Sequence, residues 1–243
     1  VYFISDVHLK LEKSNEEAKR RNKLYRLFDK IVDTGGTCFF VGDLFDFYFE
    51  YPDLIPKAYV DFFIKIDEMR RKNIEFHFLL GNHDYWIQDY IENTLMDNVY
   101  YEDAKINING KKFIITHGDG LLSWDHGYRI LKRVIRSKLF IWLLRWLHPT
   151  LTYKLARFIS RSGYEDSSSM DNNQKVKDEL VDIALSHFNK DYEYMICGHY
   201  HLGEIFETKK GKLAVLGDWF HRPSYAIFDG EKLDLVNWTS NEK

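Results

Sequence analysis

Seven polar side chains in this sequence have the chemistry of metal ligands, and each comes just after a short apolar run. They are two carboxylates, one amide and four imidazoles: Asp6, Asp43, Asn82, His8, His117, His199 and His201. Imidazoles mixed with oxygen ligands suit first-row metals such as Mn, Fe, Co or Zn, whereas Mg and Ca prefer oxygen alone. A pair of cations about 3.5–4 Å apart needs about this many ligands and acts on phosphate esters. The set therefore predicts a two-metal site.

Asp43 is the residue on which this prediction is centred. It follows an apolar run at 37–41 and Gly42, where a buried strand is expected to stop. A carboxylate has two oxygens and can bridge two cations. Extended backbone would place the first and third side chains of Asp6-Val7-His8, and of His199-Tyr200-His201, on one side of the chain. A single Asp or His at such a position is more often a structural or turn residue, so the prediction depends on the joint pattern.

The residues between the ligands predict the elements that must position them. Five β-type apolar runs each stop at one of the ligand positions, at 1–5, 37–41, 74–80, 112–116 and 194–197. One helix is expected after Ser14, which has capping-box spacing to Glu17, and ends at Gly35-Gly36. A second is expected over 53–72. Strands that end in polar clusters and alternate with helices predict an α/β fold with its site at the strand ends.

The pattern changes after His201 to short strand-like runs, at 203–207, 212–217, 224–228 and 233–238. Turns at Lys209-Lys210-Gly211 and Asp229-Gly230 separate members of this set and predict hairpins. We therefore expect an antiparallel second half of a sheet or sandwich, and an α/β (α+β) class for the whole chain.

Composition and charge are those of an ordinary soluble globular protein. The 243 residues are 45% hydrophobic and 29% charged, which suits a single domain over 1–243 that carries an insertion. The net charge of −3 gives no general reason to expect a nucleic-acid partner. Two cysteines, Cys38 and Cys197, are too few for a disulfide framework. Without a secretory pattern or an apolar run of about 18 residues, we expect a cytoplasmic protein.

The ligand blocks resemble those of the calcineurin-like metallophosphoesterases. D-x-H, G-D-x-x-D, G-N-H-D, a later His-Gly and G-H-x-H occur in the expected order from Asp6 to His201. The resemblance implies a four-layer αββα sandwich of two sheets flanked by helices. It also implies two divalent metal ions, with Mn²⁺ expected and Fe or Zn as alternatives. The first would be held by Asp6, His8, Asp43 and His201, and the second by Asp43, Asn82, His117 and His199.

The same resemblance implies catalytic roles for three consecutive residues, Asn82, His83 and Asp84. His83 follows the ligand Asn82 and would donate a hydrogen bond or a proton near the leaving oxygen. Asp84 would fix the tautomer of the His83 ring. Two bound cations would activate water and offset charge on the phosphoryl oxygens.

A helical lid insertion is expected between His117 and His199, at about residues 121–170. From Tyr128 onward one helical face is apolar, and basic residues follow the same spacing one position later: Tyr128, Leu131, Val134 and Ile135, then Arg129, Lys132, Arg133 and Arg136. An apolar run at 139–147 follows, stopped by Pro149 and too short to span a bilayer. A second basic and apolar segment covers 151–161.

Three interpretations of this insertion are open. The first is an ordinary helical hairpin, packed on the core with its basic face in water. The second is a lid whose apolar face holds acyl chains and whose basic rim meets anionic headgroups or substrate phosphate. The third is a surface for single-stranded nucleic acid, because basic residues interleaved with aromatic ones also suit that ligand.

The chain length, the His117-Gly118-Asp119 block before the insertion and the late Leu216-Gly217-Asp218-Trp219 resemble the UDP-2,3-diacylglucosamine hydrolases of lipid A biosynthesis. Those peripheral membrane enzymes cleave a pyrophosphate and release UMP and an acylated sugar 1-phosphate. The resemblance implies a lipid-linked sugar nucleotide as substrate, contact with the inner membrane surface from the cytoplasm, and no nucleic-acid partner. It implies substrate contacts by Asn82, His83, Asp125, Tyr128, Arg129, Lys132, Arg133 and Arg136.

One residue departs from the best-known branch of those hydrolases, which has Arg where this chain has His83. A basic donor is retained, so the departure bears on the substrate and not on the phosphoester chemistry. A general metal-dependent phosphodiesterase or nuclease is therefore kept as an alternative. A non-catalytic binding module is a further one, although such modules usually lose ligands and this chain has the full set. The sequence leaves the oligomeric state open.

Overall fold

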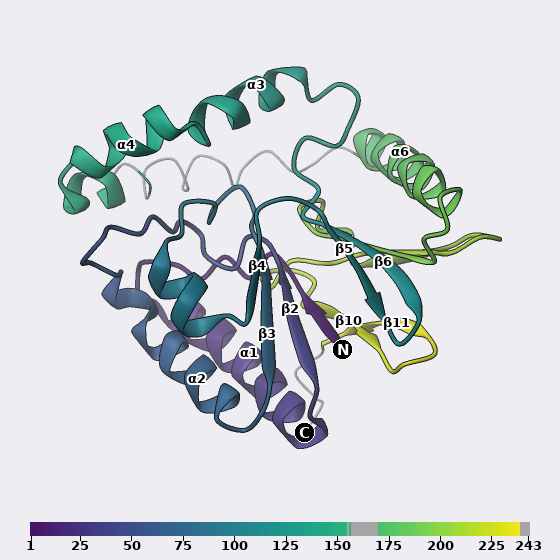
Figure 1. Cartoon of the computed structure of the whole chain (residues 1–243), viewed down its shortest axis with the longest axis horizontal. Helices are drawn as coiled ribbons and strands as arrows, with labels where there is room; N and C mark the ends of the chain where they lie inside the picture. The colour runs from purple at the N-terminus through teal and green to yellow at the C-terminus, as the bar shows by residue number, and fades with distance from the viewer. Residues whose placement is uncertain (155, 157–169, 239–243) are drawn as a thin grey trace.

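The computed structural model describes residues 1–154, 156 and 170–238 of the chain (Figure 1). Its strands are β1 Tyr2–Ile4, β2 Thr37–Val41, β3 Glu75–Leu79, β4 Asn98–Tyr100, β5 Ala104–Ile108, β6 Lys111–Thr116, β7 Tyr194–Cys197, β8 Glu204–Glu207, β9 Lys212–Val215, β10 Ser224–Phe228 and β11 Leu233–Asn237. Its labelled helices are α1 Asn15–Thr34, the 3₁₀ helix η1 Lys57–Tyr59, α2 Val60–Arg70, the π-helix η2 Ile91–Leu95, α3 His126–Ile135, α4 Lys138–Trp146 and α6 Met170–Phe188. Residues 149–154 are also helical.

The strands form two sheets that pack face to face. One has six strands in the order β11-β10-β1-β2-β3-β4, and the other has five in the order β5-β6-β7-β9-β8. β1 to β4 are parallel in the first sheet, as are β6, β7 and β9 in the second. Helices α1 and α2 pack on the outer face of the first sheet and α6 on the outer face of the second (Figure 1). The expected four-layer αββα architecture is confirmed.

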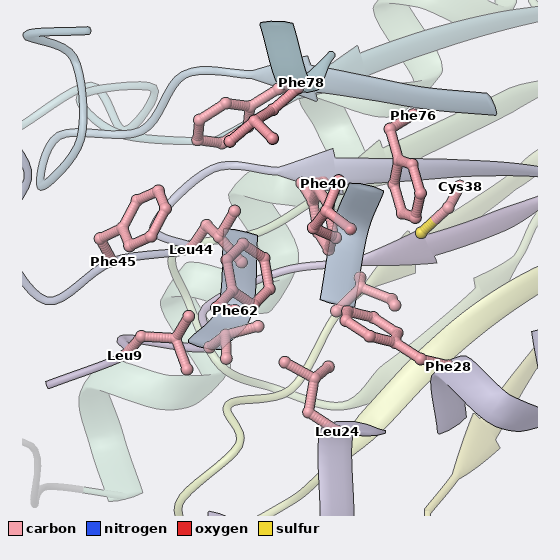
Figure 2. Close-up of a cluster of buried hydrophobic side chains, with 14 of the residues drawn as sticks. Leu9, Leu24, Phe28, Cys38, Phe40, Leu44, Phe45, Phe62, Phe76 and Phe78 are labelled. Atoms are coloured by element: carbon pink, nitrogen blue, oxygen red, sulfur yellow. The ribbon is translucent and has the colours of Figure 1, made fainter. Parts of the chain in front are cut away.

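Alternating side chains of the strands divide the core into layers. Phe40 and Phe78 point toward the helical layer, where they meet Phe28 of α1 and Phe62 of α2 (Figure 2). The intervening residues of the same strands, such as Phe39, pack instead against the second sheet. Each of the central strands is thus buried on both faces, which explains why their sequences are continuous apolar runs.

The ends of α1 follow the predicted signals. The Ser14 side chain accepts a hydrogen bond from the Glu17 amide at 3.1 Å, and Gly35 ends the helix at φ 70°. The capping-box spacing would turn the Glu17 carboxylate back to the Ser14 amide, but the carboxylate binds Arg20, Arg21 and the amide of Lys10 instead. The Ser14 half of the capping box is therefore formed, whereas the Glu17 side chain takes partners that its spacing does not predict.

Other elements differ from the sequence-based expectation. The helix predicted over 53–72 begins only at η1, because Pro56 is extended at ψ 116° and cannot donate an amide hydrogen. The apolar run after α3 is helical only to Trp146, and Pro149 opens the next helical stretch instead of closing this one. The predicted segment 151–161 lies largely outside the described residues.

The prediction that the strands after His201 form one antiparallel unit is wrong. Its two hairpins exist, β8-β9 and β10-β11, but they join different sheets. β10 pairs with β1, and β9 runs parallel to β7. The sequence patterns did not predict β4, β5 or α6.

Candidate metal centre and the helix above it

Ligands gather where the carboxyl ends of β1, β2, β3, β6 and β7 meet. β1, β2 and β3 are parallel neighbours in one sheet, and β6 and β7 are parallel neighbours in the other. The two sheets approach closely at Gly42, where a Cβ atom would lie 2.2 Å from Nδ1 of His117. No residue larger than glycine fits there. This close approach brings ligands from both sheets to one place.

Asp6 is the centre of the first group. Its Oδ1 atom lies 3.1 Å from Nε2 of His201 and 3.8 Å from Nε2 of His8. Its Oδ2 atom accepts hydrogen bonds from the His199 amide at 2.9 Å and from the Ser5 hydroxyl. One oxygen is thus fixed by the fold while the other faces the two imidazoles.

Asp43 lies between the two groups. Its Oδ2 atom is 3.3 Å from Nε2 of His117 and 3.8 Å from Nε2 of His8. Its Oδ1 atom accepts a hydrogen bond from the His83 amide at 3.0 Å. The sequence suggested a bridge through two oxygens, but here a single oxygen faces both sets of imidazoles.

The ligands form three overlapping groups, and within each group the ligand atoms lie within 4.8 Å of one another. They are Asp6, His8 and His201; His8, Asp43 and His83; and Asp43, His117 and His199. Asn82 adds an amide oxygen 3.1 Å from Nε2 of His117. All seven predicted ligands are therefore brought together, and His83 lies with them.

The backbone of these ligands is unusual. Five of the eight described non-glycine residues with positive φ are predicted ligands: Asp6 at 52°, His8 at 46°, Asp43 at 51°, His199 at 65° and His201 at 53°. The prediction that the D-x-H and H-x-H pairs are extended is therefore wrong. Hydrogen bonds to the neighbouring strand end hold this backbone, from the Asp6 amide to Gly42 at 3.1 Å and from the His8 amide to Asp43 at 2.9 Å. Strained backbone held by its surroundings is common at functional sites.

The charges and protonation states at the centre fit divalent cations. Burial opposes ionisation of Asp6, yet His201 holds its pKa at about 2. Burial likewise opposes ionisation of Asp43, whose pKa His117 and His83 hold well below its usual value. Burial lowers the pKa of His8 to about 3, so this imidazole is neutral and able to ligate. Two buried carboxylates that face imidazoles form a site that a cation would complete.

His83 is held in one tautomer. Its Nδ1 donates to the carbonyl of Asp46 at 2.7 Å, so that Nε2 faces Asp43 at 3.9 Å. The prediction gave the tautomer-fixing role to Asp84, and this is wrong. The buried Asp84 carboxylate accepts the amides of Gly81, Leu44 and Phe45 instead, and so ties the ends of β2 and β3 together.

Helix α3 turns one side toward this centre, and we call the residues on that side its inward stripe: Tyr128, Lys132 and Arg136. The hydroxyl of Tyr128 donates to Asp119 at 3.0 Å, and Nζ of Lys132 lies 2.8 Å from the same carboxylate. Arg136 donates to Asp119 and to the carbonyl of Gly81, at 3.2 Å each. The interpretation with the basic face in water is therefore wrong for these residues.

The other predicted contacts on α3 are placed differently. Arg129 donates to the carbonyls of Gly120, Leu122 and Ser123, so it braces the loop before the helix. Arg133 is exposed, and Asp125 is half-buried at the start of the helix. A substrate role for these three residues stays a prediction.

The outward surface of α3 and α4 carries many large apolar side chains. Figure 1 shows the two helices following one another along the top of the molecule. Large side chains on them are mostly exposed, among them Ile130 at 62%, Leu139 at 66% and Trp146 at 76%. Ile135, Ile141, Leu144 and the 149–154 stretch rest on an aromatic cluster, where Nε1 of Trp86 donates to the Ile135 carbonyl at 2.9 Å. None of the helices in the described ranges is both long and apolar enough to cross a bilayer.

A buried charge network behind the centre was missed from the sequence. Arg20 donates to the main-chain oxygen of His8 at 2.6 Å and pairs with Glu17. Arg21 pairs with Glu17 at 2.7 Å and also donates to the carbonyl of Lys10. A signal did exist, because positions 17, 20 and 21 continue the inward stripe of α1 that Leu24 begins.

Comparison with known proteins gives a consistent result. The family described as calcineurin-like phosphoesterase matches residues 1–203. A UDP-2,3-diacylglucosamine hydrolase of Porphyromonas gingivalis is 30% identical, covering 100% of this chain and 98% of its own. Enzymes of the same name from Aeromonas salmonicida and Shewanella baltica are 27% and 26% identical, covering 93% and 96% of this chain and 88% and 95% of theirs.

Proposed function

The chain belongs to the calcineurin-like phosphoesterase family and is a metal-dependent phosphoester hydrolase, and from that premise we propose that it acts on UDP-2,3-diacylglucosamine. The reaction would hydrolyse the pyrophosphate to UMP and 2,3-diacylglucosamine 1-phosphate, a step of lipid A biosynthesis. The orientation of α3 is the observation that carries this proposal, because Lys132 and Arg136 face the ligand centre while large apolar side chains such as Ile130 are exposed. The proposed substrate has two matching parts, because its diphosphate would bind the cations and its acyl chains would contact the apolar side chains.

The ligand groups support our assignment of residues to the cations that the family implies. Asp6, His8, Asp43 and His201 would hold one, and Asp43, Asn82, His117 and His199 the other, with Mn²⁺ as the first choice and Fe or Zn as alternatives. When bound, two cations supply an activated water and offset charge on the phosphoryl oxygens.

His83, Lys132 and Arg136 would act on the substrate directly. Nδ1 of His83 is engaged by Asp46, which leaves Nε2 to donate to the leaving oxygen. Burial lowers the pKa of His83, but Asp43 outweighs it and the net shift is upward. Lys132 and Arg136 would bind the phosphate that is not attacked, because both lie on the inward stripe of α3.

We propose further that residues of about 121–170 form a lid within a single domain over 1–243. Its described part has an apolar surface that would hold acyl chains and touch the inner membrane surface from the cytoplasm. Residues 155 and 157–169 of the proposed lid lie outside the described part of the chain. This makes the protein a peripheral membrane enzyme in our proposal.

Mass spectrometry of products tests the substrate. The purified protein with Mn²⁺ and UDP-2,3-diacylglucosamine in detergent micelles is expected to release UMP and the acylated sugar 1-phosphate. An Asp43→Asn variant is the blank. Absence of UMP with Mn²⁺, Fe²⁺ and Zn²⁺ alike, together with cleavage of bis(p-nitrophenyl) phosphate, would reject the substrate and favour a general phosphodiesterase. Absence of both activities in metal-loaded protein would favour a binding module.

A further inference from the structure

Asp119 belongs neither to the ligand set nor to the predicted substrate contacts, yet three side chains of α3 converge on it. Its Oδ2 atom accepts hydrogen bonds from Tyr128 at 3.0 Å and Arg136 at 3.2 Å, and it lies 2.8 Å from Nζ of Lys132. Lys132 also donates to the main-chain oxygen of Asp119 at 3.0 Å. Asp119 itself is only 7% exposed. One buried carboxylate therefore fixes the whole inward stripe of α3.

The spacing of that stripe matches the helix. Tyr128, Lys132 and Arg136 are four residues apart, so they lie above one another on one side of α3. Three donors at this spacing can reach a single acceptor only if the axis of the helix passes over that acceptor. The orientation of α3 is thus coupled to the position of one side chain.

The stripe passes over the ligands assigned to the second cation. At its start, the ring of Tyr128 lies 6.3 Å from the ring of His199. At its end, Arg136 donates to the carbonyl of Gly81, the residue before Asn82. Asp119 in the middle is two residues past His117. The Lys132 and Arg136 cations therefore stand over one side of the centre.

The turn before Asp119 is built to fold back under the helix. Gly118 has φ 109°, and a Cβ atom there would lie 2.9 Å from Sγ of Cys197. This position needs glycine for both conformation and space. The direction of Asp119 is consequently fixed by the end of β6, the strand that also delivers His117.

We propose that Asp119 is a positioning residue, which presents Lys132 and Arg136 to a substrate phosphate at the second-cation side without touching the substrate. Long cationic side chains lose much rotamer freedom when they are immobilised. A carboxylate that has already immobilised them removes this cost from substrate binding. One carboxylate against two cations also leaves one excess positive charge for an anion. The inference rests on the proposed function for the identity of that anion, a sugar-linked diphosphate.

Steady-state kinetics of metal-loaded Asp119→Ala test the inference, with UDP-2,3-diacylglucosamine and bis(p-nitrophenyl) phosphate as alternative substrates. We expect kcat/KM for the sugar nucleotide to fall about 10- to 100-fold, the effect of one or two charge-assisted hydrogen bonds, mainly through KM. The loss for the small diester should be at least about tenfold smaller. Asp119→Asn should be intermediate, since its amide oxygen still accepts but is uncharged. Lys138→Ala, which removes an exposed cation at the start of α4, is the matched control. It should leave kcat/KM unchanged for both substrates.

Hydrogen exchange of residues 126–136 and inhibition by inorganic phosphate separate the possible failures. Exchange should rise in Asp119→Ala, and the inhibition constant of phosphate against the small diester should rise about tenfold. Faster exchange with an unchanged substrate ratio and phosphate inhibition would reduce Asp119 to a purely structural role and overturn the proposal. Equal losses on both substrates with lost metal would also overturn it. If the wild type releases no UMP, the proposed function fails, and phosphate inhibition alone decides the role of Asp119.

Discussion

Nε2 of His117 lies 3.3 Å from Oδ2 of Asp43, within a site where both side chains are almost fully buried. Nδ1 of His117 donates to the carbonyl of Val41 at 3.0 Å, so it is Nε2 that faces the centre. Burial lowers the pKa of His117, but the Asp43 carboxylate outweighs it and raises the pKa to about 10. Without metal, this histidine is therefore protonated at neutral pH.

A pH-dependent metal affinity follows from that pair. His117 must lose its proton before it can ligate, so metal binding at pH 7 releases that proton. We expect the Mn²⁺ affinity to rise with pH up to about the pKa of His117, by tenfold per pH unit for each proton released. Calorimetry in two buffers with different ionisation enthalpies counts the protons. Zero net release at pH 7 would contradict the assignment of His117 as a ligand.

Replacing Asp43 tests the bridging position itself. Asp43→Asn keeps the shape of the side chain but removes the charge that faces both imidazole sets. We expect bound Mn²⁺ to fall below two per chain and kcat to fall about 10³-fold or more, because several kcal/mol of transition-state stabilisation depend on the cations. Metal analysis and bis(p-nitrophenyl) phosphate hydrolysis measure these effects. Asp191→Asn, a change in a surface turn with φ 66°, is the control, and equal metal content in both variants would argue against the bridge.

His83 is expected to affect turnover more than binding. A proton donor typically contributes about 10²–10⁴-fold, so His83→Ala should lower kcat by that order with a smaller change in KM. His83→Arg places a permanently charged donor there and should recover part of the activity. His187→Ala at the end of α6, where the ring packs against Tyr192 and not against the ligands, is the control. A large rise in KM at unchanged kcat would assign His83 to binding instead.

The sequence was sufficient for the ligands and the central strands because both leave local signals. β2 and β7 were placed at their observed bounds, since buried parallel strands are apolar runs that stop at polar residues. β5 was missed although Asn109-Gly110, a strong hairpin turn, separates it from β6. The sequence therefore carries a local signal for β5 as well.

Other features could not be obtained from local patterns. The left-handed backbone of Asp6 and His8 depends on hydrogen bonds to Gly42 and Asp43, which are distant in sequence. The orientation of α3 was equally hidden, because periodicity separates a basic face from an apolar face without saying which is inward. Here the inward face is set by Asp119, a buried carboxylate from another element.

Glu17 is expected to matter for stability. It is buried between Arg20 and Arg21, and removing one member of a buried ion group is strongly destabilising. Glu17→Ala should therefore lower the free energy of unfolding by about 3–5 kcal/mol, as measured by urea denaturation. Glu16→Ala, an exposed neighbour on the same helix turn, should change it by less than about 0.5 kcal/mol. Equal effects of the two substitutions would contradict the network.

The apolar surface of α4 is expected to bind lipid. Trp142 and Trp146 are 54% and 76% exposed, and their rings lie 6.0 Å apart on one side of the helix. Burying a large apolar side chain contributes ~1.5–3 kcal/mol, so Trp146→Ser should weaken binding to vesicles containing anionic lipid about tenfold or more. Vesicle flotation measures the binding, and thermal unfolding should be nearly unchanged because the side chain is exposed. Trp124→Ser, which removes a 51% exposed tryptophan from the loop before α3, is the matched control. If both substitutions weaken flotation equally, α4 is not a specific membrane contact.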